Sequence, residues 1–174
     1  MKKIAIIGSG GSGKSTLATK LGHMLHLPVF HLDAIFWKPG WEPIEREELI
    51  KKSQRIIEQN AWIIDGNYSS TMDIRLQHAD TVIFLHYKTS VCLYGIVKRR
   101  IQFHNKTRPD MGENCKEKLD WEFFQWVRDY NKTKAPAVYD RLSKLEEGKN
   151  IYVFKKRKDL NRFLRSVESA SSFN

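Results

Sequence analysis

The stretch "GSGGSGKST", residues 8–16, decides the fold that the rest of the sequence predicts. The apolar run "KKIAII" comes directly before it, so we do not expect a flexible Gly/Ser linker between two folded units. Apolar residues recur after it at helical spacing, at Leu17, Leu21, Met24 and Leu25. A strand, a glycine-rich loop and a helix in this order are the context in which Gly-x-x-x-x-Gly-Lys-Ser forms a phosphate-binding P-loop.

The residues of this loop suit a nucleoside triphosphate. Glycines let successive backbone N–H groups turn toward a polyphosphate, and the N-terminus of the following helix adds its own amides. Lys14 is expected to contact the β- and γ-phosphates and act in catalysis, and Ser15 to place its hydroxyl on Mg²⁺. The motif predicts nucleotide binding by Gly8, Ser9, Gly10, Gly11, Ser12, Gly13, Lys14 and Ser15. ATP and Mg²⁺ are therefore the expected cofactors.

Length and composition predict one folded domain over residues 1–174. Of these residues 41% are hydrophobic, which is enough to bury a core. No stretch approaches the ~20 apolar residues of a membrane span, and the N-terminal strand is too short for a signal peptide. Cys92 and Cys115 form neither a disulfide framework nor a metal-ligand spacing, so we expect a reducing cytoplasm and no membrane partner.

Positive charge is concentrated in the second half of the chain. The net charge is +10, of which residues 1–87 carry +1 and residues 88–174 carry +9. This distribution fits either a cationic surface for nucleic acid or arginines that converge on a bound polyphosphate. The run "KKRK" at 155–158 is equally well explained as a solvated face.

Apolar runs alternate with amphipathic segments along the chain. The predicted strands are residues 4–8, 28–33, 61–66, 80–86 and 150–155. The predicted helices are residues 14–26, 45–59, 90–102, 118–130, 137–146 and a closing helix over 160–167. This alternation predicts an α/β fold, with a parallel sheet covered by helices on both faces.

Two polar or aromatic segments, 34–43 and 104–115, do not fit the alternation. Loops of this length in a compact domain usually form lids or binding elements. In the first, Phe36, Trp37 and Trp41 can stack on a planar substrate or pack the loop onto the protein, and packing is slightly favoured. Trp37 is retained as a candidate for substrate binding.

Polar residues follow the predicted strands, where ligands bind in open α/β sheets. Asp65 closes the run "WIIDG" and is expected to contact Mg²⁺ or its waters, although a capping role is the alternative. Asp33, at "HLD", is expected to bind a hydroxyl acceptor as general base, with an N-cap or Asx turn equally open. Asn67 follows Asp65 and is a further candidate for substrate binding.

Arginines are the third group of candidate residues. Phosphoryl transfer depends on positioning and on neutralising the charge of three oxygens, which an arginine from a lid does well. Candidates around the second long loop are Arg99, Arg100, Arg108 and Arg128, of which at least one is expected to serve the site. Arg75 is a separate candidate for binding the acceptor or its phosphate.

The order of these motifs resembles the adenylate kinase-like P-loop kinases, which include nucleoside monophosphate, shikimate and gluconate kinases. More closely, "GSGGSGKSTLATKLG", "PVFHLDAIFWKPGW", "WIIDGNYSS" and "RPDMGENCKEKLDWEFFQWV" resemble the DNA topology modulation protein family of that superfamily, over essentially the whole chain. The resemblance implies strand order 2-3-1-4-5, an acceptor-binding segment at about 34–60 and a lid at about 103–118. The residues that it implies at the site are Lys14, Ser15 and Thr16 for the triphosphate, Asp65 for the metal, and arginines of the lid region for the transferred phosphoryl group.

The sequence departs from these kinases at the acceptor. Adenylate kinases continue from Asp-Gly with Phe-Pro-Arg, whereas "DGNYSS" stands here and the next arginine is Arg75. Shikimate kinases carry a second Asp where Ile35 stands. Both departures argue against a mononucleotide or a shikimate acceptor.

Two functions remain in competition. The first is a kinase that transfers the γ-phosphoryl group of ATP to a small-molecule acceptor. The second is a nucleotide-dependent regulatory protein associated with DNA, for which the basic C-terminal half would be the binding surface. A GTPase is disfavoured because "NKTR" and "NKTK" lack the Asp that pairs with guanine, and neither follows a strand.

Overall fold

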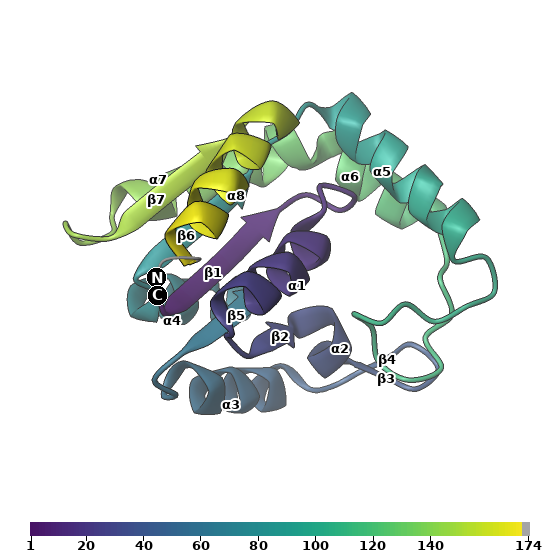
Figure 1. Ribbon diagram of the computed structural model, residues 1–174. Helices are drawn as coiled ribbons and strands as arrows, with labels where there is room; N and C mark the ends of the chain where they lie inside the picture. Colours follow the sequence, from purple (N-terminus) through teal and green to yellow (C-terminus); the bar gives the residue numbers. More distant parts are fainter. Residues whose placement is uncertain (172–174) are drawn as a thin grey trace.

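A computed structural model of the chain describes residues 1–171 and contains a five-stranded parallel sheet in the order β2-β5-β1-β6-β7 (Figure 1). The strands are β1 (Lys3–Gly8), β2 (Val29–His31), β5 (Trp62–Asp65), β6 (Thr81–Leu85) and β7 (Asn150–Phe154). Taken in chain order these five strands follow the arrangement 2-3-1-4-5, which confirms the predicted topology. The central strands are buried because helices cover both sides of their apolar runs.

Helices cover both faces of the sheet (Figure 1). One face packs against α1 (Lys14–Leu25), α5 (Thr89–Gln102) and α8 (Arg157–Ser171). The other packs against α3 (Arg46–Ile57), α4 (Ser69–His78) and α7 (Ala135–Ser143), while α6 (Trp121–Thr133) contributes to both cores. Successive side chains of a strand point to opposite faces of the sheet, so each strand contributes to two apolar cores. In β1, Ile4 and Ile6 belong to the core on the α1 side, and Ala5 and Ile7 to the core on the α3 side.

The second predicted strand is shorter than expected. Its pairing with β5 ends where His31 lies opposite Asp65, and the short helix α2 (Leu32–Phe36) follows at once. The expectation that Asp33 ends a strand is therefore wrong, because β5 itself ends at Asp65 and leaves no partner for a longer strand. Asp33 instead lies in the first turn of α2.

Helix α4 was not predicted. Its buried face combines Met72 and Leu76 with Thr71 and Arg75, so polar residues interrupt the apolar stripe that marks the other helices. The segment 34–43 also contains more structure than a loop. After α2 it forms an antiparallel hairpin of β3 (Trp37–Lys38) and β4 (Glu42–Pro43).

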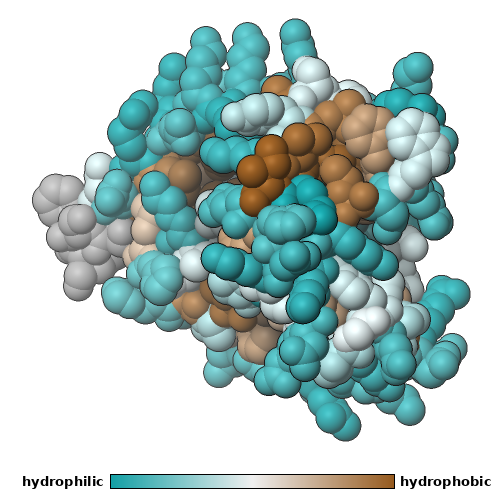
Figure 2. All heavy atoms as spheres, turned by 90° about the vertical axis from the view of Figure 1, so that its right-hand side faces the viewer, coloured by the Kyte–Doolittle hydropathy of each residue, from teal (hydrophilic) through white to brown (hydrophobic). Residues whose placement is uncertain are grey.

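Helix α5 has two dissimilar sides. Cys92 and Ile96 are buried, whereas Tyr94, Val97 and Ile101 are exposed in one stripe. Figure 2 shows the side of the molecule on which the ends of α5 and the lid lie, with apolar surface gathered among hydrophilic residues. The buried side of α5 packs against the P-loop, as described below. Within residues 1–171, no helix combines the length and the apolar character needed to span a lipid bilayer.

Candidate functional site

The P-loop runs from the end of β1 to the start of α1 and lies directly against α5. Gly11 has a φ of 72°, and a Cβ at this position would lie 2.2 Å from the carbonyl oxygen of Cys92. The approach is mutual, since a Cβ on Gly95 would lie 2.1 Å from the carbonyl oxygen of Gly11. Glycine is thus required on both sides of this contact, which fixes the loop on α5.

Helix α1 presents an N-terminus with no side-chain cap. Its N-cap residue is Gly13, and the first turn contains no acidic side chain. The Lys14 ammonium, half-buried, donates a hydrogen bond to the backbone oxygen of Ser9 at 2.9 Å. Burial lowers the pKa of Lys14, against the raising effect of the Asp33 and Asp65 carboxylates. Free amides, a helix dipole and a desolvated ammonium therefore meet at the position where the motif places phosphates.

Asp65 joins the P-loop to the neighbouring strand. In the sheet it pairs with Ile6 of β1, and its Oδ2 accepts a hydrogen bond from the Ser15 hydroxyl at 2.8 Å. The two predicted Mg²⁺ ligands thus lie side by side. Among residues 1–171 no group of three His, Cys, Asp or Glu side chains could hold a metal ion. Ser15 and Asp65 fit an ion that takes its remaining ligands from phosphates and water, as Mg²⁺ commonly does.

His31 is a residue of the site that the sequence analysis did not identify. Its Nδ1 lies 2.5 Å from Asp65 Oδ1, at the end of β2. Burial lowers the pKa of His31, but the hydrogen bond and the charge of Asp65 outweigh that effect and the pKa is raised. Its position opposite Asp65 in the β2–β5 register is the signal that could have revealed it.

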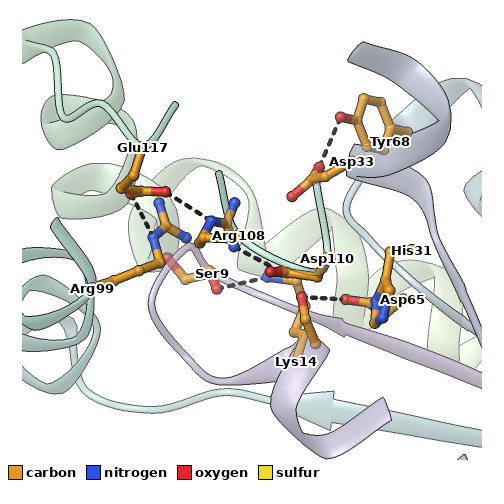
Figure 3. A network of polar contacts seen from close by, with 11 residues as sticks. Ser9, Lys14, His31, Asp33, Asp65, Tyr68, Arg99, Arg108, Asp110 and Glu117 are labelled. Carbon is orange, nitrogen blue, oxygen red and sulfur yellow. Dashed lines mark hydrogen bonds and ion pairs between the residues drawn. The ribbon is translucent and has the colours of Figure 1, made fainter. Parts of the chain in front are cut away.

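Asp33 faces the same space from α2 (Figure 3). Its Oδ1 accepts a hydrogen bond of 2.8 Å from the Tyr68 hydroxyl. Burial and the charge of Asp33 raise the pKa of Tyr68, so the phenol stays protonated and donates. Tyr68 orients the carboxylate that was predicted as general base, a role that sequence reasoning missed.

Two of the four candidate arginines lie together in the lid region. Arg99, from α5, and Arg108, from the lid, contact the buried carboxylate of Glu117 from opposite sides, each at 2.7 Å (Figure 3). Arg108 also binds Asp110 at 2.7 Å. Arg99 lies over the ring of Phe123, with 5.6 Å between its guanidinium carbon and the ring centroid. Both guanidinium groups are thus held close to the P-loop.

The other two arginine candidates lie on the surface. Arg128 is exposed and pairs with its neighbour Asp129 at 2.7 Å. Arg100 contacts His104 on the outer side of α5. The structure therefore places Arg128 away from Arg99 and Arg108, because its helix turns that position toward solvent. The expectation that at least one of the four arginines serves the site stays a prediction.

Two of the predicted substrate-binding residues, Asn67 and Trp37, make contacts within the protein. Asn67 exchanges hydrogen bonds with the backbone of Gly8, accepting from its nitrogen at 3.1 Å and donating to its oxygen. Trp37 packs between Phe36 and Trp41, at centroid distances of 4.8 and 5.4 Å. Of the two alternatives for the aromatic residues of segment 34–43, the structure has the one in which they pack the segment onto the protein.

Arg75 is fully buried and binds backbone rather than open space. Its guanidinium donates to the carbonyl oxygens of Gly66, Tyr68 and Thr71 at 3.2–3.3 Å. Burial lowers the pKa of Arg75 to about 10, which leaves it charged at neutral pH. Instead of gripping an acceptor, as predicted, it holds the turn that carries Asn67 and Tyr68.

Arg75→Met is accordingly expected to lower the free energy of unfolding by about 3 kcal/mol, because three buried carbonyl groups lose a charged donor. Chemical denaturation of the two proteins measures this difference. Arg141→Met is the matched control, since that arginine pairs with Asp73 at the surface and its loss is expected to cost less than about 1 kcal/mol. Equal losses in the two variants would contradict the structural role of Arg75.

Comparison with known proteins identifies the class of fold. No protein-family model and no curated protein sequence matches the chain. Among solved structures, a shikimate kinase from Acinetobacter baumannii in complex with shikimate has a TM-score of 0.65 at 14% identity, covering 98% of this chain and 94% of its own. A shikimate kinase from Bacteroides thetaiotaomicron has a TM-score of 0.58 at 17% identity, covering 96% of each chain.

A gluconokinase from Sinorhizobium meliloti, with a TM-score of 0.52 at 15% identity, covers 98% of this chain and 91% of its own. The chain thus has the fold of the P-loop small-molecule kinases, over 96–98% of its length. At these identities the likeness concerns the fold, and the chemistry is argued from the side chains. The resemblance to the DNA topology modulation protein family rests on the quoted motifs alone.

Proposed function

We propose that the protein is an ATP-dependent kinase that transfers the γ-phosphoryl group to a small-molecule acceptor. One observation carries this proposal. Lys14, the Ser15–Asp65 pair, Asp33 and two lid arginines, which come from five separate parts of the chain, converge on the carboxyl edge of the sheet (Figure 3). A cluster of this composition meets the requirements of phosphoryl transfer, which are positioning and charge neutralisation.

Lys14, Ser15, Asp65 and Asp33 each have a defined part in the proposed reaction. The P-loop amides and Lys14 hold the β- and γ-phosphates of ATP. Ser15 and Asp65 would hold Mg²⁺, which would supply positive charge to neutralise the phosphates. Asp33, oriented by Tyr68, accepts the proton of an acceptor hydroxyl whose oxygen attacks the γ-phosphorus. The bond between that phosphorus and the β–γ bridging oxygen breaks, and ADP leaves.

In this proposal the acceptor binds beside Asp33, near α2 and the hairpin of β3 and β4. Arg75 is committed to backbone carbonyls, so it does not supply the cation that a phosphorylated acceptor requires. Ile35, two residues after Asp33 on α2, is partly buried and packs against the apolar core. These contacts favour an uncharged hydroxyl compound over a nucleoside monophosphate.

Release of ADP from Mg-ATP by the purified protein tests the proposal, with nucleosides, nucleotides, sugars and hydroxy acids as acceptors. We expect one chemical class to stimulate release, and Asp33→Asn to abolish the stimulation because the general base is lost. Tyr68→Phe is expected to reduce the stimulation less, since it keeps the Asp33 carboxylate and removes only the hydrogen bond that orients it. Stimulation that survives in Asp33→Asn would contradict the assigned base.

A DNA-associated regulatory function is the second candidate, because residues 155–158, at the start of α8, are all exposed and basic. It predicts DNA affinity that falls steeply with salt and does not depend on Lys14. Titration of a labelled duplex at two salt concentrations, with wild type and Lys14→Ala, separates it from the kinase proposal. Affinity for DNA that requires neither Lys14 nor ATP would favour the second candidate.

A further inference from the structure

Two carboxylates of the lid region contact Arg99 and Arg108 in different ways. Glu117 uses both oxygens, Oε1 on the Nε of Arg99 and Oε2 on the Nε of Arg108, at 2.7 Å each. Asp110 uses one oxygen, on the Nη1 of Arg108, at 2.7 Å. Two positive and two negative charges therefore neutralise each other beside the P-loop (Figure 3).

Glu117 holds the inner edges of both arginines. Its side chain is 1% exposed, and its backbone nitrogen donates to the oxygen of Lys106 at 2.9 Å, which anchors it within the lid. Oε1 of Glu117 accepts a hydrogen bond from the Nε of Arg99, whereas Oε2 and the Nε of Arg108 form an ion pair without the alignment of a hydrogen bond. The terminal amino groups of Arg99 make no hydrogen bond within residues 1–171. Those groups, and the Nη2 of Arg108, remain available to an anion. A planar guanidinium fixed by one edge in this way is pre-organised at the other.

Asp110 is placed differently. It is 15% exposed and contacts an outer amino group of Arg108, on the edge that an incoming anion would use. Its negative charge also acts on His31, which contacts Asp65. A phosphate oxygen of a bound nucleotide and the Asp110 carboxylate would therefore compete for the same guanidinium.

We propose that Glu117 is a positioning residue that orients Arg99 and Arg108 toward the triphosphate, and that Asp110 occupies the phosphate position on Arg108 until nucleotide binds. This inference rests on the proposed nucleotide-dependent function. It assigns opposite effects to two carboxylates of equal charge in one lid. Removing the charge of Asp110 strengthens triphosphate binding, and removing that of Glu117 weakens it.

The weaker triphosphate binding expected on removing the charge of Glu117 is opposite to what net charge alone predicts. Every Glu→Gln or Asp→Asn change makes the protein more positive, and general attraction for an anion then rises slightly. Glu113, an exposed carboxylate of the same lid, measures that general contribution. Glu113→Gln is therefore the matched control for both variants.

The experiment is a calorimetric titration of wild type, Glu117→Gln, Asp110→Asn and Glu113→Gln with Mg-ATP and, separately, with magnesium triphosphate. We expect Glu117→Gln to raise the Kd about tenfold, Asp110→Asn to lower it about threefold, and Glu113→Gln to change it less than about twofold. The same ranking is expected with inorganic triphosphate, since the arginines contact phosphate and not the nucleoside. Thermal melting without nucleotide identifies any variant that is unfolded.

The outcomes separate the inference from the function on which it rests. Failure of the wild type to bind Mg-ATP would overturn both. Two results with a wild type that binds Mg-ATP would overturn the inference alone. One is a Kd for Glu117→Gln as low as that for Glu113→Gln, and the other is a Kd for Asp110→Asn equal to that of the wild type. If Glu117→Gln does not fold, Glu117→Asp, which keeps the charge but shortens its reach, is expected to weaken binding, and Asp110→Asn retains its own prediction.

Discussion

Lys14→Ala is expected to reduce ADP release from Mg-ATP by about 10²–10³-fold. The ammonium lies in the P-loop and is held by the Ser9 carbonyl oxygen, and burial lowers its pKa. A desolvated cation in that position stabilises charge on the transferred phosphoryl group more than an exposed one would, because little water screens it. Steady-state measurement of ADP at saturating acceptor, or without acceptor if none is known, gives the ratio of rates.

Arg128→Ala is the matched control for this prediction. It also removes one positive charge, but from an exposed side chain paired with Asp129. We expect its rate to remain within about twofold of wild type, as is usual for surface substitutions. A Lys14→Ala protein that folds normally and keeps more than about a tenth of the rate would contradict the role given to the P-loop.

Gly11→Ala is expected to lower the free energy of unfolding by about 3 kcal/mol or more and to weaken nucleotide binding. The added Cβ would lie 2.2 Å from the oxygen of Cys92 and 2.8 Å from the nitrogen of Ile96. Both are backbone atoms of α5, so the P-loop and the helix must separate. Chemical denaturation and titration with Mg-ATP measure the two effects.

Substitutions at two further glycines separate the two expected causes of the lower stability, backbone strain and collision with α5. Gly40, in the hairpin, has a φ of 81° and no atom within 4 Å of an added Cβ, so Gly40→Ala measures backbone strain alone, about 1–2 kcal/mol. Gly95 lies within α5 with no positive φ, so Gly95→Ala measures the collision without backbone strain, offset by about 1 kcal/mol of gained helix propensity. If Gly95→Ala is as stable as wild type, the close contact between α5 and the P-loop is wrong.

The sequence predicts the main features of the sheet and of the phosphate site because both depend on local patterns. Buried parallel strands are recognisable as apolar runs, and their carboxyl ends must meet at one edge. That rule places Asp65 beside the P-loop, where the structure has it bonded to Ser15. Helix α4 escaped prediction because Thr71 and Arg75 are buried in it, and a buried polar residue looks like a solvent-facing one in the sequence.

The partners of the polar side chains depend on tertiary structure and could not be predicted in the same way. Asn67, just after a strand end, and Arg75, in the following helix, were expected to bind a ligand, yet both bind backbone groups of the fold. Arg99 and Arg108 were expected near phosphates, but the carboxylate that joins them, Glu117, belongs to a polar loop with no periodicity. Only the folded lid brings these three charges together.

The central claim is that this chain transfers a phosphoryl group, and the most direct test follows the group itself. Wild type and Lys14→Ala would be incubated with Mg²⁺, ATP labelled at the γ-phosphate and a mixture of small metabolites, and the labelled products would be separated. The account predicts label in a new small organic compound with the wild type and none with Lys14→Ala. Label that stays in ATP, or appears only as inorganic phosphate in the presence of the full mixture, would contradict it.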